Sequence, residues 1–574
     1  MKFNVVNDRL KLMRTNAYKR WEVMHMNFCC EGENIHLSEN STPQDLWNLV
    51  RNGRGKEDAV LASLDGDIID FNTPFPRDGN VTWLPMNSPE AFRAYCRTAV
   101  FLLVCACREI YGEEGEIAVK HSLGNALYCE FKDGHTPLQK ELSVVLDRMK
   151  QIIAEKRDIK KVSVGKKRAL AYLRMTERWE DAAFLMQLDT DELDVDQCGS
   201  VVDYYLGPLL PDMSFIRYID LHSYAPGFLL RMAPLGKDEK GEAEEAPLFA
   251  GVFLESERWS ELIGCRNLLS LNNAIASGEI YDYVAVAEAL QEKRIAELAD
   301  YVCGHTPKIR LVCIAGPSSS GKTTFVKRLI IHLRVNGSKP VMLSLDDFFH
   351  RREDMKGKDW EGIDALDISL FEETVSALLE GKKVRLPRFD FITGEQVWDT
   401  EPVQLGENQP ILIEGLHALN PALTYFVPGY QCVRVYLSAL TQITINDHNR
   451  ISTSDTRLLR RLVRDAQFRG SGAEHTLKVW ESVRQGEEKN IFHFQNRADV
   501  VFNSALLYEI PVLKNFAVPL LQGVKRGSPV YSDAQRLLHF LRPFRTVSPT
   551  LVPEYSLLRE FIGYRDVGKS FLNH

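Results

Sequence analysis

The chain has 574 residues, too many for one hydrophobic core, and this length predicts roughly two to four domains. Hydrophobic residues make up 45% and charged residues 26%, which is typical of a globular protein and excludes a disordered or fibrous one. The net charge of −8 argues against bulk attraction to nucleic acid or to anionic lipid. We therefore expect a multidomain protein for which nucleic acid is not the favoured partner, although a local basic patch stays open.

Three features predict the location of the protein. The longest strongly apolar run, residues 99–107, is far shorter than the roughly twenty residues that a membrane helix needs. The first residues carry no apolar stretch typical of a secretion signal, and the eleven cysteines include no CxxC pair. We expect a cytoplasmic protein with reduced thiols, no membrane segment and no disulfide framework or zinc ribbon.

The N-terminal half combines strand-like and helical patterns. Turn signals between residues 27 and 86 delimit short predicted strands, among them 60–63 and 81–84. Predicted helices follow at 91–110, 137–156 and 280–302. Between them, residues 236–247 (GKDEKGEAEEAP) are charged and turn-rich, which predicts a solvated loop.

From residue 308 onward, strands and helices alternate. Predicted strands lie at 309–315, 340–345, 411–413, 433–437 and 500–502. The helical pattern at 323–335 stops at Asn336-Gly337, a good C-terminal signal. Strands separated by helices predict βαβ units and therefore a doubly wound, mostly parallel sheet.

Residues 316–323, GPSSSGKT, fit the phosphate-binding pattern G-x-x-x-x-G-K-[ST] between a predicted strand and a predicted helix. The glycines let backbone N–H groups turn toward a phosphate, and the helix directs its positive end at the anion. Lys322 is expected to reach the β- and γ-phosphates, and the Thr323 hydroxyl is expected to bind Mg²⁺. The residues expected to bind ATP or GTP are Gly316, Ser318, Ser319, Ser320, Gly321, Lys322, Thr323 and Thr324.

Carboxylates follow two of the predicted strands. Asp346 and Asp347 end the second strand, at the edge of an open α/β sheet where ligands bind. Adjacent strand residues point to opposite faces, so only one of the two can face the nucleotide. Glu414 ends the third strand in an apolar run that closes on an acid, as in the Walker B pattern. We interpret these acids as candidates for Mg²⁺ binding and proton transfer, the alternative being helix caps or solvated strand ends.

Four arginines, Arg457, Arg460, Arg461 and Arg464, recur at i, i+3, i+4 and i+7 and so share one helix face. Such a stripe is commonly a solvated face. Arginines without interleaved acids repel one another unless an anion lies opposite, and a transferring phosphate would be such an anion. We therefore interpret this helix as a lid that closes over phosphate.

In order and spacing, several motifs between about residues 308 and 524 resemble the uridine kinase and phosphoribulokinase group of P-loop kinases. They are GPSSSGKTT, LSLDDFF (343–349), LPRFDF (386–391), IEG (413–415) and SDTRLLRRLVRD (454–465). The resemblance implies ATP and Mg²⁺ as cofactors and a nucleoside or similar small alcohol as substrate.

The resemblance also implies a role for each matching residue. Asp346 would position the substrate hydroxyl and act as base, and Glu414 would lie at the metal together with Thr323 and Asp346. The arginines Arg457, Arg460, Arg461 and Arg464 would bind phosphate, and Lys322 completes the catalytic set. Asp364, in WEGIDALD, corresponds loosely to an acid that holds the ribose.

One departure concerns the base of the nucleoside. Uridine kinases carry a histidine shortly after this FDF segment that reads the pyrimidine, whereas here Ile392-Thr393-Gly394-Glu395 follows. Phe389 and Phe391 remain as candidates to stack on a base. Three functions therefore stay open: a nucleoside kinase acting on a 5′-hydroxyl, a kinase of another metabolite alcohol such as a sugar phosphate, and a nucleotide-gated RNA-binding regulatory protein.

The N-terminal half resembles two domains of threonyl-tRNA synthetase, the β-grasp TGS domain and the second additional, editing domain. The markers are YCRTAVFLL (95–103), HSLGNALYCEF (121–131) and DYYLGPLLP (203–211). The synthetase editing site uses HxxxH and CxxxH, but the matching positions here are Arg97, Phe101, Tyr205 and Leu209. We therefore expect neither deacylation nor zinc binding, and we expect His121 to be structural.

The predicted organisation has six parts. They are an N-terminal extension (1–26), a TGS-like β-grasp domain (27–88), an α+β editing-like domain (89–235), a linker with a connecting helix (236–304), the α/β P-loop kinase domain (305–540) and a docked tail (541–574). A bacterial nucleoside kinase subfamily has this layout. The sequence leaves homo-oligomerisation open.

Overall fold

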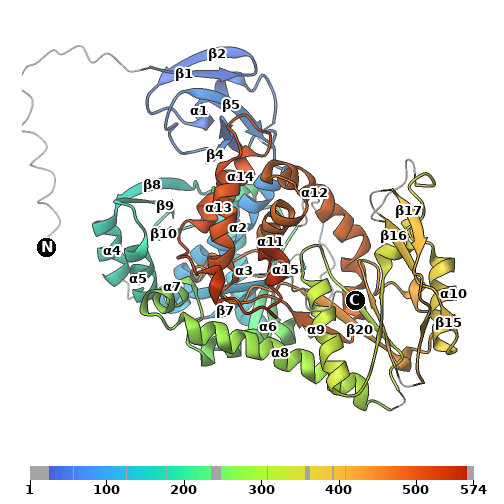
Figure 1. The fold of residues 1–574 in the computed structure, drawn as a ribbon. Coiled ribbons are helices and arrows are strands. Elements are labelled where there is room, and N and C mark those ends of the chain that lie inside the picture. Colours follow the sequence, from blue (N-terminus) through green and yellow to red (C-terminus); the bar gives the residue numbers. More distant parts are fainter. Residues whose placement is uncertain are drawn as a thin grey trace, which may run out of the picture.

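The computed structural model describes residues 25–55, 57–124, 126–175, 178–233, 247–306, 308–355, 362–390, 393–407 and 409–564 (Figure 1). Most of the predicted charged loop (236–246), most of the N-terminal extension and Phe391 lie outside these residues. No helix in the described ranges has both the length and the apolar character needed to cross a bilayer.

The first unit is a five-stranded sheet covered by one helix. Its elements are β1 (His25–Cys30), β2 (Glu33–Ser38), α1 (Pro43–Val50), β3 (Leu61–Leu64), β4 (Asp67–Ile69) and β5 (Gly79–Leu84), in the sheet order β2-β1-β5-β3-β4. Thr42 and Asp45 form a reciprocal cap at the start of α1. Leu46 and Trp47 of this helix are buried against the sheet residue Phe28. These elements form a small α+β unit, and the assignment of residues 27–88 to a TGS-like domain stays a prediction.

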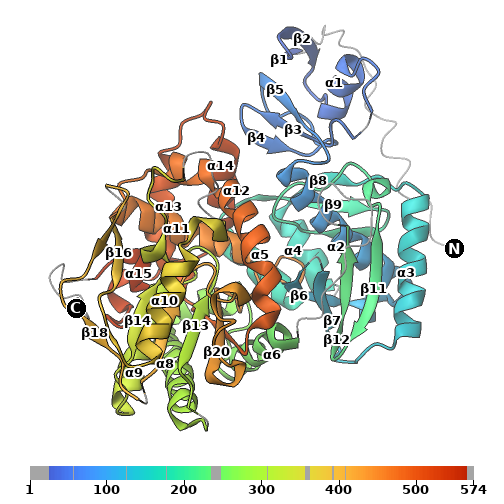
Figure 2. The same cartoon turned by 90° about the vertical axis from the view of Figure 1, so that its right-hand side faces the viewer.

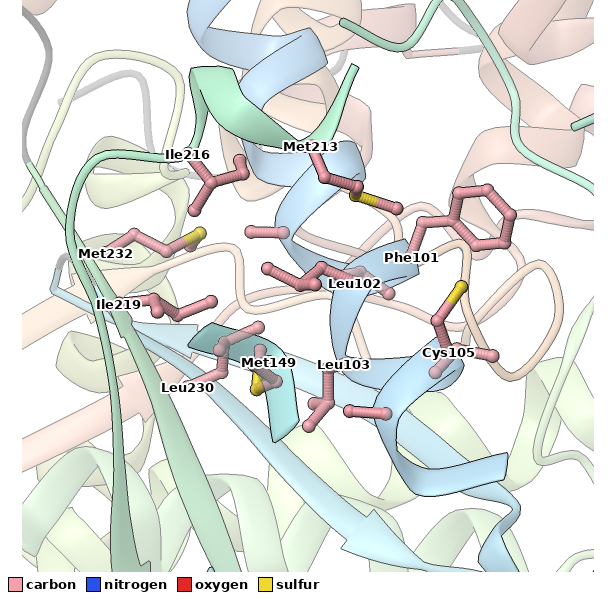
Figure 3. Packing of buried hydrophobic residues seen from close by; sticks show 14 of the residues in the cluster. Phe101, Leu102, Leu103, Cys105, Met149, Met213, Ile216, Ile219, Leu230 and Met232 are labelled. Atoms are coloured by element: carbon pink, nitrogen blue, oxygen red, sulfur yellow. The ribbon is translucent and has the colours of Figure 1, made fainter. Parts of the chain in front are cut away.

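The second unit is built around a long buried helix, α2 (Pro89–Tyr111). An antiparallel sheet β11-β12-β7-β6 packs against it, with α3 (Gln139–Ala154) alongside. The strands are β6 (Ile117–Leu123), β7 (Ala126–Phe131), β11 (Ile219–Tyr224) and β12 (Gly227–Met232). Figure 3 shows Leu102 and Leu103 of α2 beside Met149 and Leu230, while Phe101 points away from these two residues. The unbroken apolar run of α2 is therefore explained by burial on nearly all sides.

A smaller layer extends from this unit. Its sheet, β10-β9-β8, consists of β8 (Lys160–Gly165), β9 (Glu192–Cys198) and β10 (Val201–Asp203). Two short helices, α4 (Lys166–Met175) and α5 (Trp179–Gln187), form an apolar cluster with this sheet, in which Leu185, Leu193 and Val195 are buried.

The stretch expected to be a linker with one helix contains three packed helices, α6 (Pro247–Leu262), α7 (Leu268–Ser277) and α8 (Ile280–Gly304). Figure 2 shows α6 between the two halves of the molecule. The Phe253 ring stacks on His121 with centroids 3.7 Å apart, and the Phe249 ring lies 5.4 Å from that of Tyr436. This stretch is more than the expected linker because apolar side chains of α6 pack against both the N-terminal half and the C-terminal half.

The C-terminal half contains the predicted five-stranded sheet, and all of its strand pairs are parallel. Its strands are β13 (Leu311–Ala315), β14 (Val341–Ser344), β19 (Ile411–Glu414), β20 (Cys432–Ser438) and β21 (Val500–Asn503), in the order β14-β19-β13-β20-β21. Helices α8 and α9 (Lys322–Val335) pack on one face, and α10 (Ile368–Leu379) belongs to the cluster on the other. The doubly wound P-loop fold is confirmed.

The C-terminal half has further elements outside this sheet. They are the hairpin β16 (Pro387–Asp390) and β17 (Glu395–Trp398), and the helices α11 (Thr453–Phe468), α12 (Ala473–Asn490), α13 (Glu509–Gln522), α14 (Tyr531–Leu541) and α15 (Arg559–Ile562). The described part of the tail after α14, residues 542–564, is docked, because Leu558 and Phe561 are fully buried. This docking brings α15 against α11, close to the phosphate-binding loop.

Candidate active site at the phosphate-binding loop

The loop between β13 and α9 has the backbone that its sequence predicts. Ser319 and Gly321 have φ of 59° and 95°, in the left-handed region that favours glycine. A Cβ on Gly316 would lie 2.2 Å from the carbonyl oxygen of Leu437, so only glycine fits there. The Lys322 ammonium donates to the carbonyl oxygens of Gly316 (2.8 Å) and Pro317 (3.2 Å), and burial lowers its pKa.

Two backbone N–H groups of this region donate to carboxylates from other parts of the chain. The Ser318 N–H donates to Glu487 Oε1 of α12 at 2.7 Å, and the Thr324 N–H donates to Glu560 Oε2 of α15 at 3.2 Å. N–H groups of a first helical turn lack partners within the helix and accept anions readily. The carboxylate oxygens therefore stand where phosphate oxygens of a nucleotide would bind, and the loop fits ATP.

The candidate acids differ in their surroundings. The Asp347 carboxylate accepts the Phe389 N–H at 3.2 Å and so holds strand β16. Asp346 is exposed and interacts electrostatically with Lys322, and partial loss of hydration raises its pKa. Glu414 is buried, accepts the Ser344 hydroxyl at 3.1 Å and also has a pKa raised by burial. The expectation that the two aspartates end the strand is wrong, because β14 stops at Ser344 and both lie in the short 3₁₀ helix Leu345–Phe348, whose turn separates their side chains.

These groups also suit Mg²⁺. Within the described ranges, no set of three or more His, Cys, Asp or Glu side chains is placed to hold a metal ion. Mg²⁺ commonly binds one or two carboxylates and keeps waters or phosphate oxygens as its remaining ligands. Asp346 and Glu414 interact electrostatically with Lys322, and together with Thr323 they would supply oxygen ligands of this kind.

The arginines of α11 already have anionic partners. The Arg457 guanidinium pairs with Glu487 at 2.6 Å and donates to the Ser318 carbonyl oxygen at 3.2 Å. Arg460, 1% exposed, pairs with Glu509 at 2.5 Å. Acids on α12 and α13 thus provide the counter-charge that the sequence interpretation assigned to a transferring phosphate.

Two arginines of α11 face the loop more directly. Arg461 Nη1 donates to the Ser318 hydroxyl at 3.0 Å, and Arg464 Nη1 lies 4.0 Å from Glu560. The opposite side of the helix is packed, with Leu459 and Leu462 fully buried. The interpretation of α11 as a lid is wrong for this structure, because the helix is part of the packed body of the domain. Binding of phosphate by its arginines stays a prediction.

The expected substrate residues are less clearly placed. Asp364 is exposed in a short 3₁₀ helix, Ile363–Ala365. Phe389 is buried and its ring lies 5.8 Å from that of Phe349, so little of it is left to stack on a base. Phe391 lies outside the described residues. Their substrate roles stay predictions.

Sequence reasoning missed Glu487 and Glu560. Neither belongs to a recognisable motif, and each reaches the loop only through the packing of its helix on α11. For Glu487, the available signal was the arginine stripe of α11, because arginines without interleaved acids need negative charge opposite them.

The four positions that match the synthetase editing ligands do come together. Arg97 donates to the Pro208 carbonyl oxygen at 2.8 and 3.0 Å, and the rings of Phe101 and Tyr205 lie 5.4 Å apart. Leu209 is buried beside them. Burial between aromatic rings lowers the pKa of His121 to about 3, so this histidine is neutral and structural.

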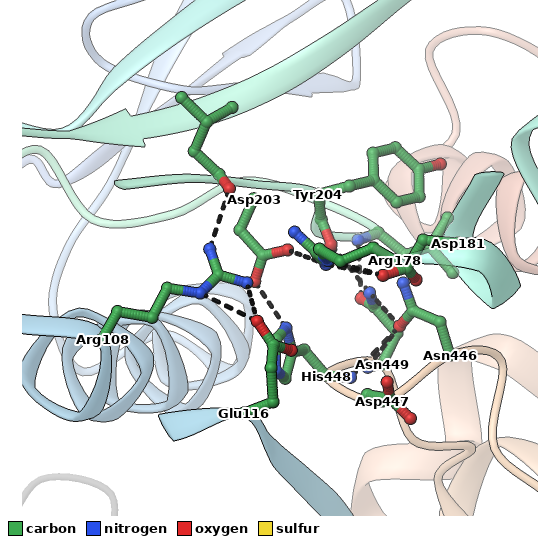
Figure 4. Close-up of polar contacts among 12 residues, drawn as sticks. Arg108, Glu116, Arg178, Asp181, Asp203, Tyr204, Asn446, Asp447, His448 and Asn449 are labelled. Atoms are coloured by element: carbon green, nitrogen blue, oxygen red, sulfur yellow. Dashed lines mark hydrogen bonds and ion pairs between the residues drawn. The ribbon is translucent and has the colours of Figure 1, made fainter. Parts of the chain in front are cut away.

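A buried polar network joins the two halves (Figure 4). His448, five residues before α11, lies 2.5 Å from Asp203, and Arg178 pairs with the same carboxylate at 3.1 Å. Burial opposes the charge on Asp203, but His448 and Arg178 outweigh it and hold the pKa of that carboxyl well below its usual range. Burial alone would lower the pKa of His448, yet Asp203 raises it.

A parallel sheet with a phosphate-binding loop after its central strand, together with an acid at the end of the neighbouring strand, defines a P-loop nucleotide-binding domain. Residues 311–510 match the sequence model of the phosphoribulokinase / uridine kinase family. The C-terminal half of the chain therefore carries a domain of that family, and the N-terminal region is similar to threonine–tRNA ligases.

The chain has two kinds of relatives, threonine–tRNA ligases and uridine-cytidine kinases. A threonine–tRNA ligase of Syntrophotalea carbinolica is 24% identical over 199 residues, 34% of this chain and 31% of the ligase. Uridine-cytidine kinase B of Dictyostelium discoideum is 27% identical over 203 residues, 34% of this chain and 75% of the kinase. The chain thus spans about a third of the ligase and three quarters of the kinase.

Among solved structures, one described as a possible uridine kinase from Bacillus stearothermophilus is 21% identical. The match covers 37% of this chain and 98% of that one, with a TM-score of 0.24. This similarity is too low to support an argument about function.

Proposed function

We propose that the chain is an ATP- and Mg²⁺-dependent kinase that transfers the γ-phosphoryl group to the 5′-hydroxyl of a nucleoside. The observation that carries the proposal is the meeting of Lys322, Asp346 and Glu414 at the carboxyl ends of the neighbouring strands β13, β14 and β19. Phosphoryl transfer requires a cation at the phosphates, a carboxylate at the nucleophile and an acid at the metal. The family match over residues 311–510 supports this interpretation.

Each side chain has a task that its surroundings suit. Asp346 accepts the proton of the attacking hydroxyl, and its raised pKa makes it a stronger base than an ordinary aspartate. Glu414 and Thr323 would hold Mg²⁺ together with Asp346, and Lys322 lies within the loop to balance the phosphate charge. ATP supplies the phosphoryl group, and Mg²⁺ neutralises its charge.

The acceptor is the least constrained part of the proposal. A sugar phosphate or another metabolite alcohol would use the same catalytic residues. The relative named as a uridine-cytidine kinase favours a nucleoside, whereas the missing pyrimidine-reading histidine leaves the base open. We further propose that residues 27–88 form a TGS-like domain and that the protein works in the cytoplasm.

A substrate panel tests the proposal. The purified full chain is incubated with ATP–Mg²⁺ and nucleosides, sugar alcohols or sugar phosphates, and the release of ADP and of phosphorylated product is measured. Asp346→Asn should lower turnover by about 10²- to 10⁴-fold while ATP binding survives. Asp347→Asn is the matched control, because its amide oxygen still accepts the Phe389 N–H. If no acceptor raises ADP release above background, the kinase proposal fails.

A further inference from the structure

The small layer formed by β8, β9, β10, α4 and α5 encloses a cavity of about 350 Å³. This volume lies at the lower end of the roughly 300–1,000 Å³ of small-molecule sites. The cavity is far from the P-loop along the chain and shares no lining residue with the candidate active site. The kinase proposal therefore leaves it without a role.

The walls of the cavity are apolar. Val162 and Val164 of β8 and Val195 of β9 line it from the sheet, and Leu173, Phe184 and Leu185 line it from the helices. Alternate residues of one strand share a face, so the spacing of these valines gives an apolar floor. Such walls favour the apolar body of a ligand, because burying it removes apolar surface from water.

One end of the cavity is polar, and its charges are already balanced. Arg178 pairs with Asp181 at 2.7 Å and with Asp203 at 3.1 Å, and the side chains of Tyr204 and Asn446 lie nearby (Figure 4). A ligand that brought a further charge to this end would have to break a buried pair. This buried, charge-balanced part of the cavity therefore suits a neutral group.

The open end carries a cation. Arg168 of α4 lines the cavity and is exposed, which marks where the cavity meets solvent. Among the described residues, no acidic side chain lies within ion-pair distance of Arg168. A guanidinium at the mouth favours a carboxylate on the part of the ligand that remains near solvent.

We propose that this cavity is a binding site for a small carboxylate with an apolar body, such as a medium-chain or aromatic carboxylic acid. The apolar body lies between the sheet and the two helices, and the carboxylate pairs with Arg168 at the mouth. The site belongs to the N-terminal half, and its polar end touches Asn446 of the C-terminal half. The proposal does not depend on kinase activity.

Binding is measured on the full chain with the fluorescent apolar anion 1-anilinonaphthalene-8-sulfonate, which is then displaced by decanoate or by the uncharged decanamide. We expect one saturable site from which decanoate displaces the dye. Arg168→Ala should weaken decanoate about threefold to fivefold, as for a partly exposed ion pair, and leave decanamide unchanged. Arg174→Ala is the matched control, because Arg174 is an exposed arginine of the same helix that does not line the cavity.

A second variant, Ala169→Phe, fills the cavity from α4 and should weaken both displacers at least tenfold. If this variant fails to fold, the comparison of Arg168→Ala with Arg174→Ala still tests the proposal, because both arginines are exposed. The proposal is overturned if decanoate does not displace the dye, or if Arg168→Ala and Arg174→Ala behave alike.

Discussion

Glu560 places a negative charge where a nucleotide phosphate would bind. Its Oε2 accepts the Thr324 N–H at 3.2 Å, in the first turn of α9, and its Oε1 lies 4.0 Å from Arg464. The side chain is held there because the neighbouring Phe561 is fully buried, under the guanidinium of Arg460. ATP must displace this carboxylate to use the same donor, so we predict that Glu560→Gln binds ATP more tightly than the wild-type chain.

The magnitude follows from two contributions. A hydrogen bond to a charged group is worth about 1.5–3 kcal/mol and a neutral one about 0.5–1.5 kcal/mol, so the amide is easier to displace by about 1–1.5 kcal/mol. Two like charges about 5 Å apart repel by about 1–3 kcal/mol for an effective dielectric constant between about 80 and about 20. Taking the lower ends together gives about 2 kcal/mol, or at least a tenfold lower Kd.

Isothermal titration with a non-hydrolysable ATP analogue and Mg²⁺ measures this Kd. Glu488→Gln is the control, because Glu488 is an exposed acid beside Glu487 in the sequence, and its removal should change the Kd less than twofold. Equal affinities of Glu560→Gln and the wild-type chain would refute the reasoning, since they would mean that this carboxylate does not compete with phosphate. If the loop does not bind ATP at all, the titration shows no binding for the wild-type chain or for either variant.

Two further predictions concern stability. His448→Ala should lower the free energy of unfolding by about 3 kcal/mol, because Asp203 loses a buried partner and keeps Arg178. The raised pKa of His448 means that its stabilisation is full below about pH 6.5 and is lost as the pH rises through the folded-state value, so the difference between variant and wild type should shrink at alkaline pH. Gly316→Ala should cost about 1–3 kcal/mol and abolish ATP binding, because its Cβ would overlap the Leu437 carbonyl oxygen.

Both stability predictions are checked by urea unfolding against matched controls. His475→Ala removes an exposed histidine of α12 and should leave stability unchanged. Gly429→Ala adds a Cβ where no atom lies within 4 Å, and it should be tolerated. A pH-independent loss in His448→Ala would contradict the assigned ion pair, and a stable, ATP-binding Gly316→Ala would contradict the assigned loop geometry.

The parallel sheet was predictable because its strands are buried on both faces and read as short apolar runs between helical patterns. Each of the five predicted strands lies within two residues of its observed bounds, and the helix expected at 323–335 is α9 (Lys322–Val335). The helices α6 and α7 were harder to predict. The partners of α6 come from both halves of the chain, and α6 directly follows a charged stretch that obscured its start.

The candidate site was predictable as far as local motifs reach. The P-loop, Asp346 and Glu414 each lie at the end of a strand, so the order of elements brings them to one edge of the sheet. The partners of the arginines were not predictable, because Glu487, Glu509 and Glu560 come from helices whose packing the sequence does not reveal. Repulsion within the arginine stripe required an anion, but it did not say whether a substrate or the chain itself provides it.

The connection between the halves runs through α11. His448 is fixed by the buried Asp203 of the N-terminal half, and α11 begins five residues later at Thr453. On that helix, Arg457 and Arg461 contact the P-loop at Ser318. A shift of the N-terminal half would therefore move the start of the helix whose side chains reach the candidate active site. The synthetase-like half is thus part of the scaffold that positions this site, although its own editing positions are filled by Arg97, Phe101, Tyr205 and Leu209.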